Sequence, residues 1–241
     1  MNKKIIFRWL KIAILLYCVI GIAWYYAQDR LLLHPVKVDQ DTTYSFRQPF
    51  TELFLNYDTA TSLNVMQLRT ADSPARGVIL FFHDGSGNIG DYTVRSEELT
   101  RQGYECWMMD YPGFGKSTGP MSEQRLYDLA LVFYKLARSR WKPSQIVIYG
   151  QGFGTGIAAQ LASVRDCRRL ILEEPYYSMT GLLQRYLFLY PVGMMSHYHL
   201  PTYSYLQAVT APVTFIDGDG SLRSSLKPGD EWVAAGTSIR L

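Results

Sequence analysis

Five apolar runs of strand length limit the folds open to this sequence more than any other feature. They are Gly77 to Phe82 (GVILFF), Tyr104 to Asp110, Gln145 to Tyr149, Arg169 to Glu174 and Pro212 to Asp217. Strands that are apolar without alternation are typical of a parallel sheet covered on both faces. Stretches with helical spacing separate the runs, and Ser122 is placed to cap one such helix. The pattern predicts one α/β domain with a mostly parallel, doubly wound sheet.

Two further runs precede these five. TELFLNY (Thr51 to Tyr57) and SLNVMQLR (Ser62 to Arg69) also have strand character. They are close together in the sequence, so we expect them to form an antiparallel edge of the sheet.

The first thirty residues differ from the rest. Basic residues precede a charge-free run from Ile12 to Ala27 that ends in aromatic residues. With its flanks, this run approaches the about 20 residues that a bilayer span requires, and the basic flank predicts a cytoplasmic N-terminus. A cleaved signal peptide is the alternative, but no small-x-small pattern follows the run. We expect residues 1–28 to be an uncleaved signal anchor, a single-pass helix, and residues 29–241 to face the periplasm or the cell exterior.

The remaining composition excludes several function classes. The formal net charge is only +3, so the domain lacks the basic surface of a nucleic-acid-binding protein. The three cysteines have no metal-ligand spacing, and Cys106 in ECWMMD is expected in the core. We expect no metal or other cofactor.

One segment breaks the strand and helix alternation. Residues 176–206 are rich in Tyr, Leu and Met and are interrupted by Pro191 and Pro201. Short helices over the strand ends, as in a lid, would explain this composition, and such a lid could bind a small acyl or peptide ligand.

The segment IVIYGQGFGTGIAAQLA, Ile146 to Ala162, reads as a strand, a glycine turn and a helix. The nucleophile elbow G-x-S-x-G has this form, because small flanking residues allow a sharp turn that exposes the serine. Here Gly152 stands at the serine position. The backbone N–H of Phe153 is the donor that remains for an oxyanion or ligand.

Several motifs together resemble small membrane-anchored α/β-hydrolases related to serine aminopeptidases and acyl-protein thioesterases. They are QDRLLLHP after the apolar run, the His83 loop HDGSGNIG, DYPGFGKSTG from Asp110, YGQGFGTG, and LILEEPYYS from Leu170. The resemblance implies an α/β-hydrolase fold with a small helical lid. It also implies hydrolysis of acyl esters, thioesters or peptides, with Gly85, Ser86 and Phe153 around the oxyanion or ligand.

The departures from this family fall on its catalytic positions. Gly152 replaces the serine, and Asp84 replaces the glycine that follows the loop histidine. Asp219 is the candidate acid, but no histidine follows it. Without an activated nucleophile only about 10³- to 10⁴-fold of rate enhancement survives in a typical triad enzyme. We therefore expect a catalytically impaired protein, either a ligand-binding pseudo-enzyme or a divergent sequence without a function of its own.

Two alternatives belong to other classes. A weak esterase-like hydrolase would use Ser86, Ser221 or a water held by Asp219. A nucleotide-binding module would use the Gly150–Gly156 turn, with Glu173-Glu174 as the ribose acid, although the third glycine of G-x-G-x-x-G is absent. The zinc alternative for His197 and His199 lacks a nearby acid or cysteine in the sequence, so we expect lid-surface residues.

The C-terminus is short compared with the family pattern. The sequence ends soon after EWVAAG, where the family continues into a last strand and helix. We expect a truncated fold with one face of the final strands poorly covered, and hence a marginally stable domain.

Overall fold

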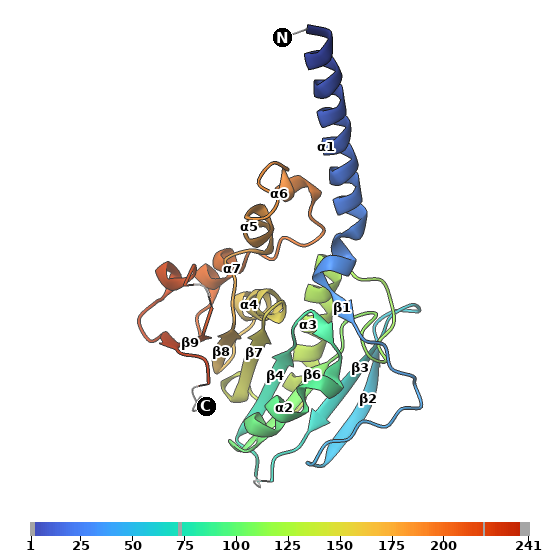
Figure 1. Cartoon of the computed structure of the whole chain (residues 1–241). Coiled ribbons are helices and arrows are strands. Elements are labelled where there is room, and N and C mark those ends of the chain that lie inside the picture. Colours follow the sequence, from blue (N-terminus) through green and yellow to red (C-terminus); the bar gives the residue numbers. More distant parts are fainter. Residues whose placement is uncertain (1–2, 72–73, 219, 237–241) are drawn as a thin grey trace.

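The computed structural model describes residues 3–71, 74–218 and 220–236. A 30-residue helix, α1 (Lys3–Leu32), projects from an α/β domain that contains all the other elements (Figure 1). Its charge-free centre and its length make α1 long and apolar enough to cross a membrane, by length and composition alone.

An eight-stranded sheet forms the centre of the domain. Its spatial order is β10-β9-β8-β7-β4-β6-β3-β2. The strands are β2 (Phe50–Asn56), β3 (Ser62–Leu68), β4 (Gly77–Phe82), β6 (Tyr104–Met109), β7 (Ile146–Gln151), β8 (Arg169–Glu173), β9 (Val213–Ile216) and β10 (Glu231–Val233). The pairs β2–β3 and β3–β6 are antiparallel, and every other pair is parallel. The predicted parallel sheet and its antiparallel edge are both confirmed.

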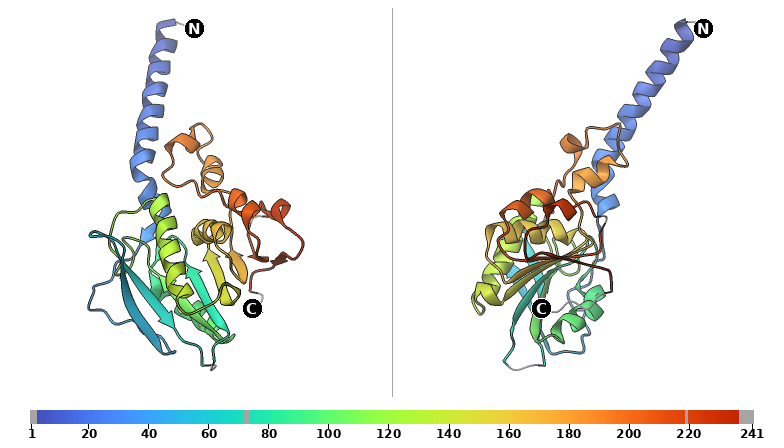
Figure 2. Two further views of the ribbon diagram at one scale, coloured as in Figure 1. Left: turned by 180° about the vertical axis from the view of Figure 1, so that it is seen from behind. Right: turned by 90° about the vertical axis from the view of Figure 1, so that its left-hand side faces the viewer.

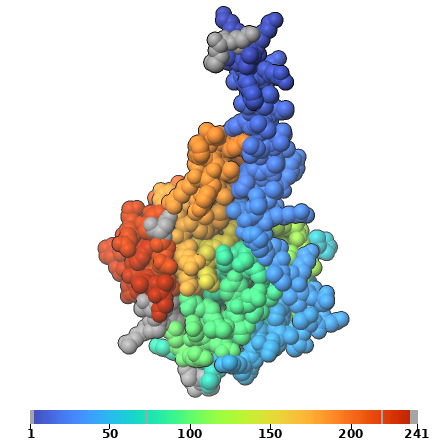
Figure 3. Space-filling model, viewed as in Figure 1, coloured from blue at the N-terminus to red at the C-terminus, as the bar shows by residue number. Residues whose placement is uncertain are grey.

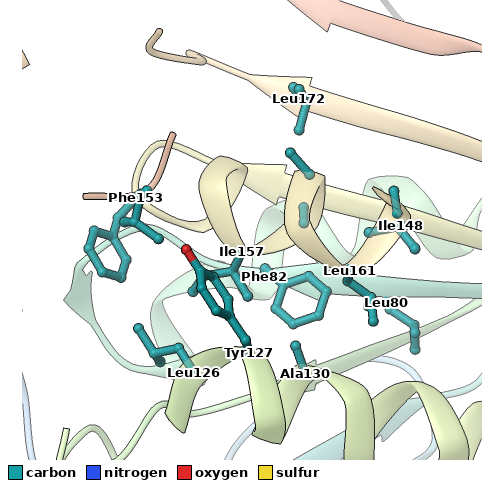
Figure 4. Close-up of a cluster of buried hydrophobic side chains, with 14 of the residues drawn as sticks. Leu80, Phe82, Leu126, Tyr127, Ala130, Ile148, Phe153, Ile157, Leu161 and Leu172 are labelled. Carbon is teal, nitrogen blue, oxygen red and sulfur yellow. The ribbon is translucent and has the colours of Figure 1, made fainter. Parts of the chain in front are cut away.

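Helices cover both faces of the sheet, as a doubly wound fold requires. The helices α3 (Glu123–Arg138) and α4 (Gly154–Val164) lie on one face, and α2 (Thr93–Thr100) lies on the other (Figure 2). The side chains of β4 alternate between the two cores: Leu80 and Phe82 pack toward α3 and α4 (Figure 4), whereas Phe81 packs toward α2. Short 3-10 helices precede α2 (Ile89–Tyr92) and β7 (Pro143–Gln145).

The predicted cap of α3 is present. The Ser122 hydroxyl accepts a hydrogen bond from the Arg125 N–H, which satisfies one of the free donors of the first turn. The apolar residues Leu126, Ala130 and Phe133 form the buried side of this helix. The helical spacing therefore gave a correct account of both the start of α3 and its buried face.

The predicted lid segment contains three short helices. These are α5 (Met179–Gln184), α6 (Val192–Met195) and α7 (Thr202–Ala208). The last of them packs on α4, whereas α5 and α6 extend beyond the sheet and lie beside α1 (Figures 1 and 2).

The end of the described chain adds a strand to the sheet. It passes through a 3-10 helix (Arg223–Ser225) and pairs β10 in parallel to β9. Trp232 stacks on Phe215 with ring centroids 5.3 Å apart, and Leu222 is fully buried. An edge strand extends the sheet sideways, so the expectation that one face of the last strands is poorly covered stays a prediction.

Candidate functional site

The predicted turn connects β7 to α4 at the carboxyl edge of the parallel strands, where ligands bind in open α/β sheets. Two of its glycines are required by close packing. A Cβ on Gly150 would lie 2.6 Å from the Gly154 carbonyl oxygen, and one on Gly154 would lie 2.2 Å from the Phe82 carbonyl oxygen. The glycine pattern therefore follows from a turn pressed against β4 and α4, as in a nucleophile elbow, and needs no bound phosphate to explain it.

A side chain from another loop lies against Gly152, the residue at the serine position of the G-x-S-x-G pattern. Gly152 has φ of 49°, and a Cβ at this residue would lie 2.4 Å from Oδ1 and 2.7 Å from Cγ of Asp84. The half-buried Asp84 carboxylate thus fills the volume into which a serine side chain would project. The two departures from the family pattern are physically one change, because the glycine makes room for the aspartate.

The same carboxylate takes the oxyanion donor. Asp84 Oδ1 accepts a 2.8 Å hydrogen bond from the Phe153 N–H. This N–H lies at the N-terminus of α4, where the helix dipole favours negative charge. The Phe153 N–H, the donor expected to remain for an oxyanion or ligand, is therefore bound to a carboxylate of the chain itself.

The other half of the expected oxyanion hole is held by the chain that follows α1. A two-stranded parallel ladder joins β1 (His34–Pro35) to β5 (Ser86–Gly87), and the His34 N–H donates to the Gly85 carbonyl at 2.7 Å. Gly85 is buried, and its Cα faces Leu33, whose Cδ2 would be 2.9 Å from an added Cβ. The chain leaving α1 therefore fixes the loop that follows β4.

Ser86 has no base within its loop. It is exposed, and its carbonyl accepts a hydrogen bond from the Tyr92 hydroxyl. His83 is fully buried, with Nδ1 2.6 Å from the Asp84 carbonyl oxygen. Its other nitrogen, Nε2, lies 3.6 Å from Asp110 Oδ1. The imidazole thus faces the core and Asp110, and it is a structural histidine as expected.

Burial moves both titratable groups of this pair toward their neutral forms. Desolvation lowers the pKa of His83 to about 4. It raises the pKa of Asp110 to about 7, although the Ile89 N–H donates to the carboxylate. At neutral pH the His83 ring is uncharged, which suits a residue that orders the core between β4 and β6.

The remaining acid candidates differ in their surroundings: Glu174 is exposed. Glu173 accepts hydrogen bonds from the Tyr149 hydroxyl at 2.7 Å and from Arg95. A carboxylate in these contacts is not available to a ribose, which weighs against the nucleotide alternative. Asp219 lies outside the described residues.

A cavity of about 160 Å³ lies between the first part of the lid and Ser221. Its lining residues are Tyr176, Tyr177, Ser178, Gly181, Leu182, Arg185 and Ser221. This set includes neither Gly152 nor Asp84, and the volume is below the about 300 Å³ at which small-molecule pockets begin. The candidate Ser221 therefore lines a space separate from the turn.

The two lid histidines are exposed, as expected, but each lies beside an acid. His197 Nδ1 is 3.0 Å from Asp29 Oδ1, and His199 Nδ1 is 3.6 Å from Glu123 Oε2. These acids come from distant parts of the sequence, which is why no acid is found near the two histidines along the chain. Within the described ranges no cluster of three or more metal-ligating side chains is present.

Sequence reasoning missed how Asp84 and Leu33 act at the site. Asp84 was visible as a departure from the His-Gly pattern, and LLLHP was visible as a motif after the apolar run. Their meaning depends on contacts between loops far apart in the sequence. The paired substitution, an acid in one loop and a glycine in the other, was the available signal.

The comparisons agree with this architecture. The family model described as alpha/beta hydrolase fold matches residues 77–234. The lysophosphatidylserine lipase ABHD12 of Danio rerio is 33% identical over 144 residues, which cover 56% of this chain and 36% of that protein. Alpha/beta hydrolase domain-containing protein 17C of Xenopus tropicalis is 32% identical over 148 residues, 60% of this chain and 46% of that protein. The matches thus span less than half the length of these relatives.

Solved structures show the same fold. The Pyrococcus furiosus esterase Pf2001 matches with a TM-score of 0.61 at 17% identity and covers 87% of this chain and 90% of the esterase. An alpha-beta hydrolase from Vibrio vulnificus matches with a TM-score of 0.64 at 21% identity, over 78% of this chain and 73% of that chain. At these identities the likeness concerns the fold alone.

Proposed function

Since this chain belongs to the alpha/beta hydrolase fold family, we propose that it is a membrane-anchored member that does not carry out covalent acyl transfer. One observation carries the proposal: the Asp84 carboxylate occupies both the space of the nucleophile side chain and the Phe153 N–H. Electrostatic stabilisation of an oxyanion needs free donors that already point at the developing charge. A fixed carboxylate at that point repels a second negative charge instead.

The rest of the site supports the same proposal. Gly152 has no atom that can attack a carbonyl, and His83 is buried against Asp110 rather than turned toward the elbow. The relatives whose printed names state a lipase or an esterase activity match only part of this chain or share only its fold. An acyl or peptide ligand stays a prediction, and it would have to displace Asp84 or enlarge the cavity beside Ser221.

A fluorophosphonate probe tests the missing covalent step. The full chain in detergent micelles is expected to remain unlabelled under conditions that label an active serine hydrolase to completion. Stoichiometric labelling of the folded chain at one serine, absent after heat denaturation, would overturn the proposal. Ser86→Ala and Ser221→Ala variants then show whether either candidate is the labelled residue.

The membrane anchor is the second part of the proposal. It rests on α1, whose apolar side chains from Ile5 to Ile22 are largely exposed while basic residues flank its N-terminus. An apolar helix with this exposure is unfavourable in water, and the basic flank favours the cytoplasmic side. The domain then lies on the outer face.

Alkaline carbonate extraction and protease protection test this part. The full chain is expected to stay in the membrane fraction, with the domain digested only from the outer side. A Leu16→Arg variant, which places a charge in the centre of α1, is expected to reduce insertion. Release of the unaltered chain by carbonate would refute the anchor, and digestion from the cytoplasmic side would refute its orientation.

A further inference from the structure

The lid carries a cluster of apolar side chains at its end, which we call the lid tip and define as Tyr186–Met195. Tyr186, Phe188, Leu189 and Met194 are 78, 73, 66 and 85% exposed. No charged residue occurs between Arg185 and His197. An exposed patch of this kind on a soluble domain marks an interaction surface.

The lid tip is packed directly on α1. The Tyr190 and Tyr17 rings are stacked with centroids 4.5 Å apart, and each hydroxyl is hydrogen-bonded to the other segment's backbone: Tyr17 to Leu189 O and Tyr190 to Tyr17 O, both at 2.9 Å. Gly21 allows the close approach, because a Cβ there would lie 2.9 Å from Tyr190 Cε1. In Figures 1 and 3 the lid lies beside the lower part of α1, and the upper part projects beyond it.

The helix and the lid become polar at the same level. Gln28 is fully buried between them: its Nε2 donates to Met195 O at 3.0 Å, and its Oε1 accepts from the His197 N–H at 2.8 Å. Next to it, His197 pairs with Asp29. This shared polar level is where a water–bilayer boundary would be expected.

The contacts on α1 fix how far the lid tip reaches beyond this level. Gln28 lies eleven positions after Tyr17, which is about 16 Å along an α-helix at about 1.5 Å per residue. The hydrocarbon core of a bilayer is about 30 Å thick, so this distance corresponds to about one leaflet. A helix inserted down to Gln28 carries the lid tip with it.

The backbone of the lid tip is also suited to an apolar surrounding, where an unpaired carbonyl is costly. Side chains add to the backbone hydrogen bonds of its turns, in which Leu187 O and Tyr190 O already accept from the Tyr190 and Val192 N–H groups. The Gln184 Nε2 donates to Leu187 O and Tyr190 O, the Tyr17 hydroxyl donates to Leu189 O, and His199 Nε2 lies 3.0 Å from Gly193 O. A loop in water could leave these groups to the solvent.

From these contacts we infer that the lid tip inserts into the acyl chains of the leaflet next to the domain, beside α1. The partner is the lipid of the membrane that α1 spans, so this inference rests on the proposed anchor. The domain is then held to the bilayer at two points, and the lid tip cannot leave the bilayer without transferring Phe188, Leu189 and Met194 into water.

Depth-dependent quenching of a fluorescent label tests the inference in the full chain. The label is attached to one cysteine at a time, with Cys18 and Cys167 otherwise replaced by serine and the fully buried Cys106 retained. Phe188→Cys reports on the lid tip, and Met194→Cys repeats the measurement at a second exposed side chain. The protein is reconstituted into phosphatidylcholine vesicles that carry a doxyl group near the middle or near the carbonyl end of the acyl chain.

Two matched positions make the outcome specific. Native Cys18 on α1 reports the anchor, and Val94→Cys, 72% exposed on α2, reports a surface in water. We expect the labels at 188 and 194 to lose emission to the acyl-chain quenchers as the Cys18 label does, and the label at 94 to be quenched only by aqueous iodide. Quenching of Cys18 by lipid together with quenching of 188 and 194 by iodide would refute lid insertion and leave the anchor intact. Iodide quenching at all four positions would refute both.

Discussion

The coupling between Asp84 and Gly152 can be measured with a double-mutant cycle. A serine at Gly152 must adopt a left-handed φ, which costs about 1–2 kcal/mol for a residue with a Cβ. Its Cβ would also lie 2.4 Å from Asp84 Oδ1, so the carboxylate must move and release the Phe153 N–H. A hydrogen bond to a charged group contributes about 1.5–3 kcal/mol.

The single variant Gly152→Ser should therefore lower the free energy of unfolding by about 2.5–5 kcal/mol, the sum of the two contributions. Asp84→Gly should lower it by about 1.5–3 kcal/mol through the lost hydrogen bond. In the double variant the serine finds empty space, and the hydrogen bond is lost only once. The double variant should then be more stable than additivity predicts by about 1.5–3 kcal/mol, a value within the usual range for residues in contact.

Urea unfolding of the four proteins, followed by circular dichroism in detergent micelles, measures this difference. An interaction energy within about 0.5 kcal/mol of zero is what independent sites show, and it would refute the placement of Asp84 over Gly152. A Val94→Ser variant, at an exposed position on α2, serves as the control for additivity with Asp84→Gly. The double variant should gain no esterase activity, because His83 still faces Asp110.

Three further predictions concern the buried polar pairs and the sheet edge. The pKa of His83 is about 4 in the folded state against 6.5 for the free side chain, so this residue makes stability rise with pH between these values. The pKa of Asp110 is about 7 in the folded state against 3.8 for the free side chain, so this residue makes stability fall with rising pH. Between about pH 4 and 6.5 the two effects roughly cancel in the unaltered chain. Asp110→Asn should therefore leave a stability that rises with pH, and His83→Gln one that falls with pH, each by up to about 1.4 kcal/mol per pH unit in urea titrations at several pH values. Equal pH dependence of all three proteins would refute this. Lys116 is almost fully buried and donates a 2.8 Å hydrogen bond to Glu52. Glu52→Gln should lower the free energy of unfolding by about 3 kcal/mol, because it leaves the buried ammonium group without its carboxylate. The double variant Glu52→Gln/Lys116→Met should lose less in the same assay. Trp232→Ala should lower the free energy of unfolding by about 1–2 kcal/mol, because it removes the stack on Phe215 and the contact of the Arg223 guanidinium with the ring. Trp232→Phe should keep most of this stability. Equal losses in the two variants would show that the stack does not hold β10.

Local patterns in the sequence were sufficient for the fold. Strand-length apolar runs such as GVILFF and the Ser122 cap depend on the burial and hydrogen bonding of neighbouring residues, and these are readable along the chain. The glycines of the elbow were readable for the same reason. The C-terminal strand β10 was not, because three residues with one aromatic side chain carry no periodic signal.

The sequence by itself also determined that Gly152 stands where the elbow pattern has serine, since the residue at a position needs no structure to establish it. Only the tertiary structure decided what fills the space of the serine side chain. Asp84 lies 68 positions before Gly152, and its place over the elbow results from the pairing of β4 with β7, which brings the two loops to the same edge of the sheet. The contact of the lid tip with Tyr17 joins residues still farther apart. Such contacts depend on how the layers pack in three dimensions, and a pattern along the sequence does not show which distant residues this packing brings together.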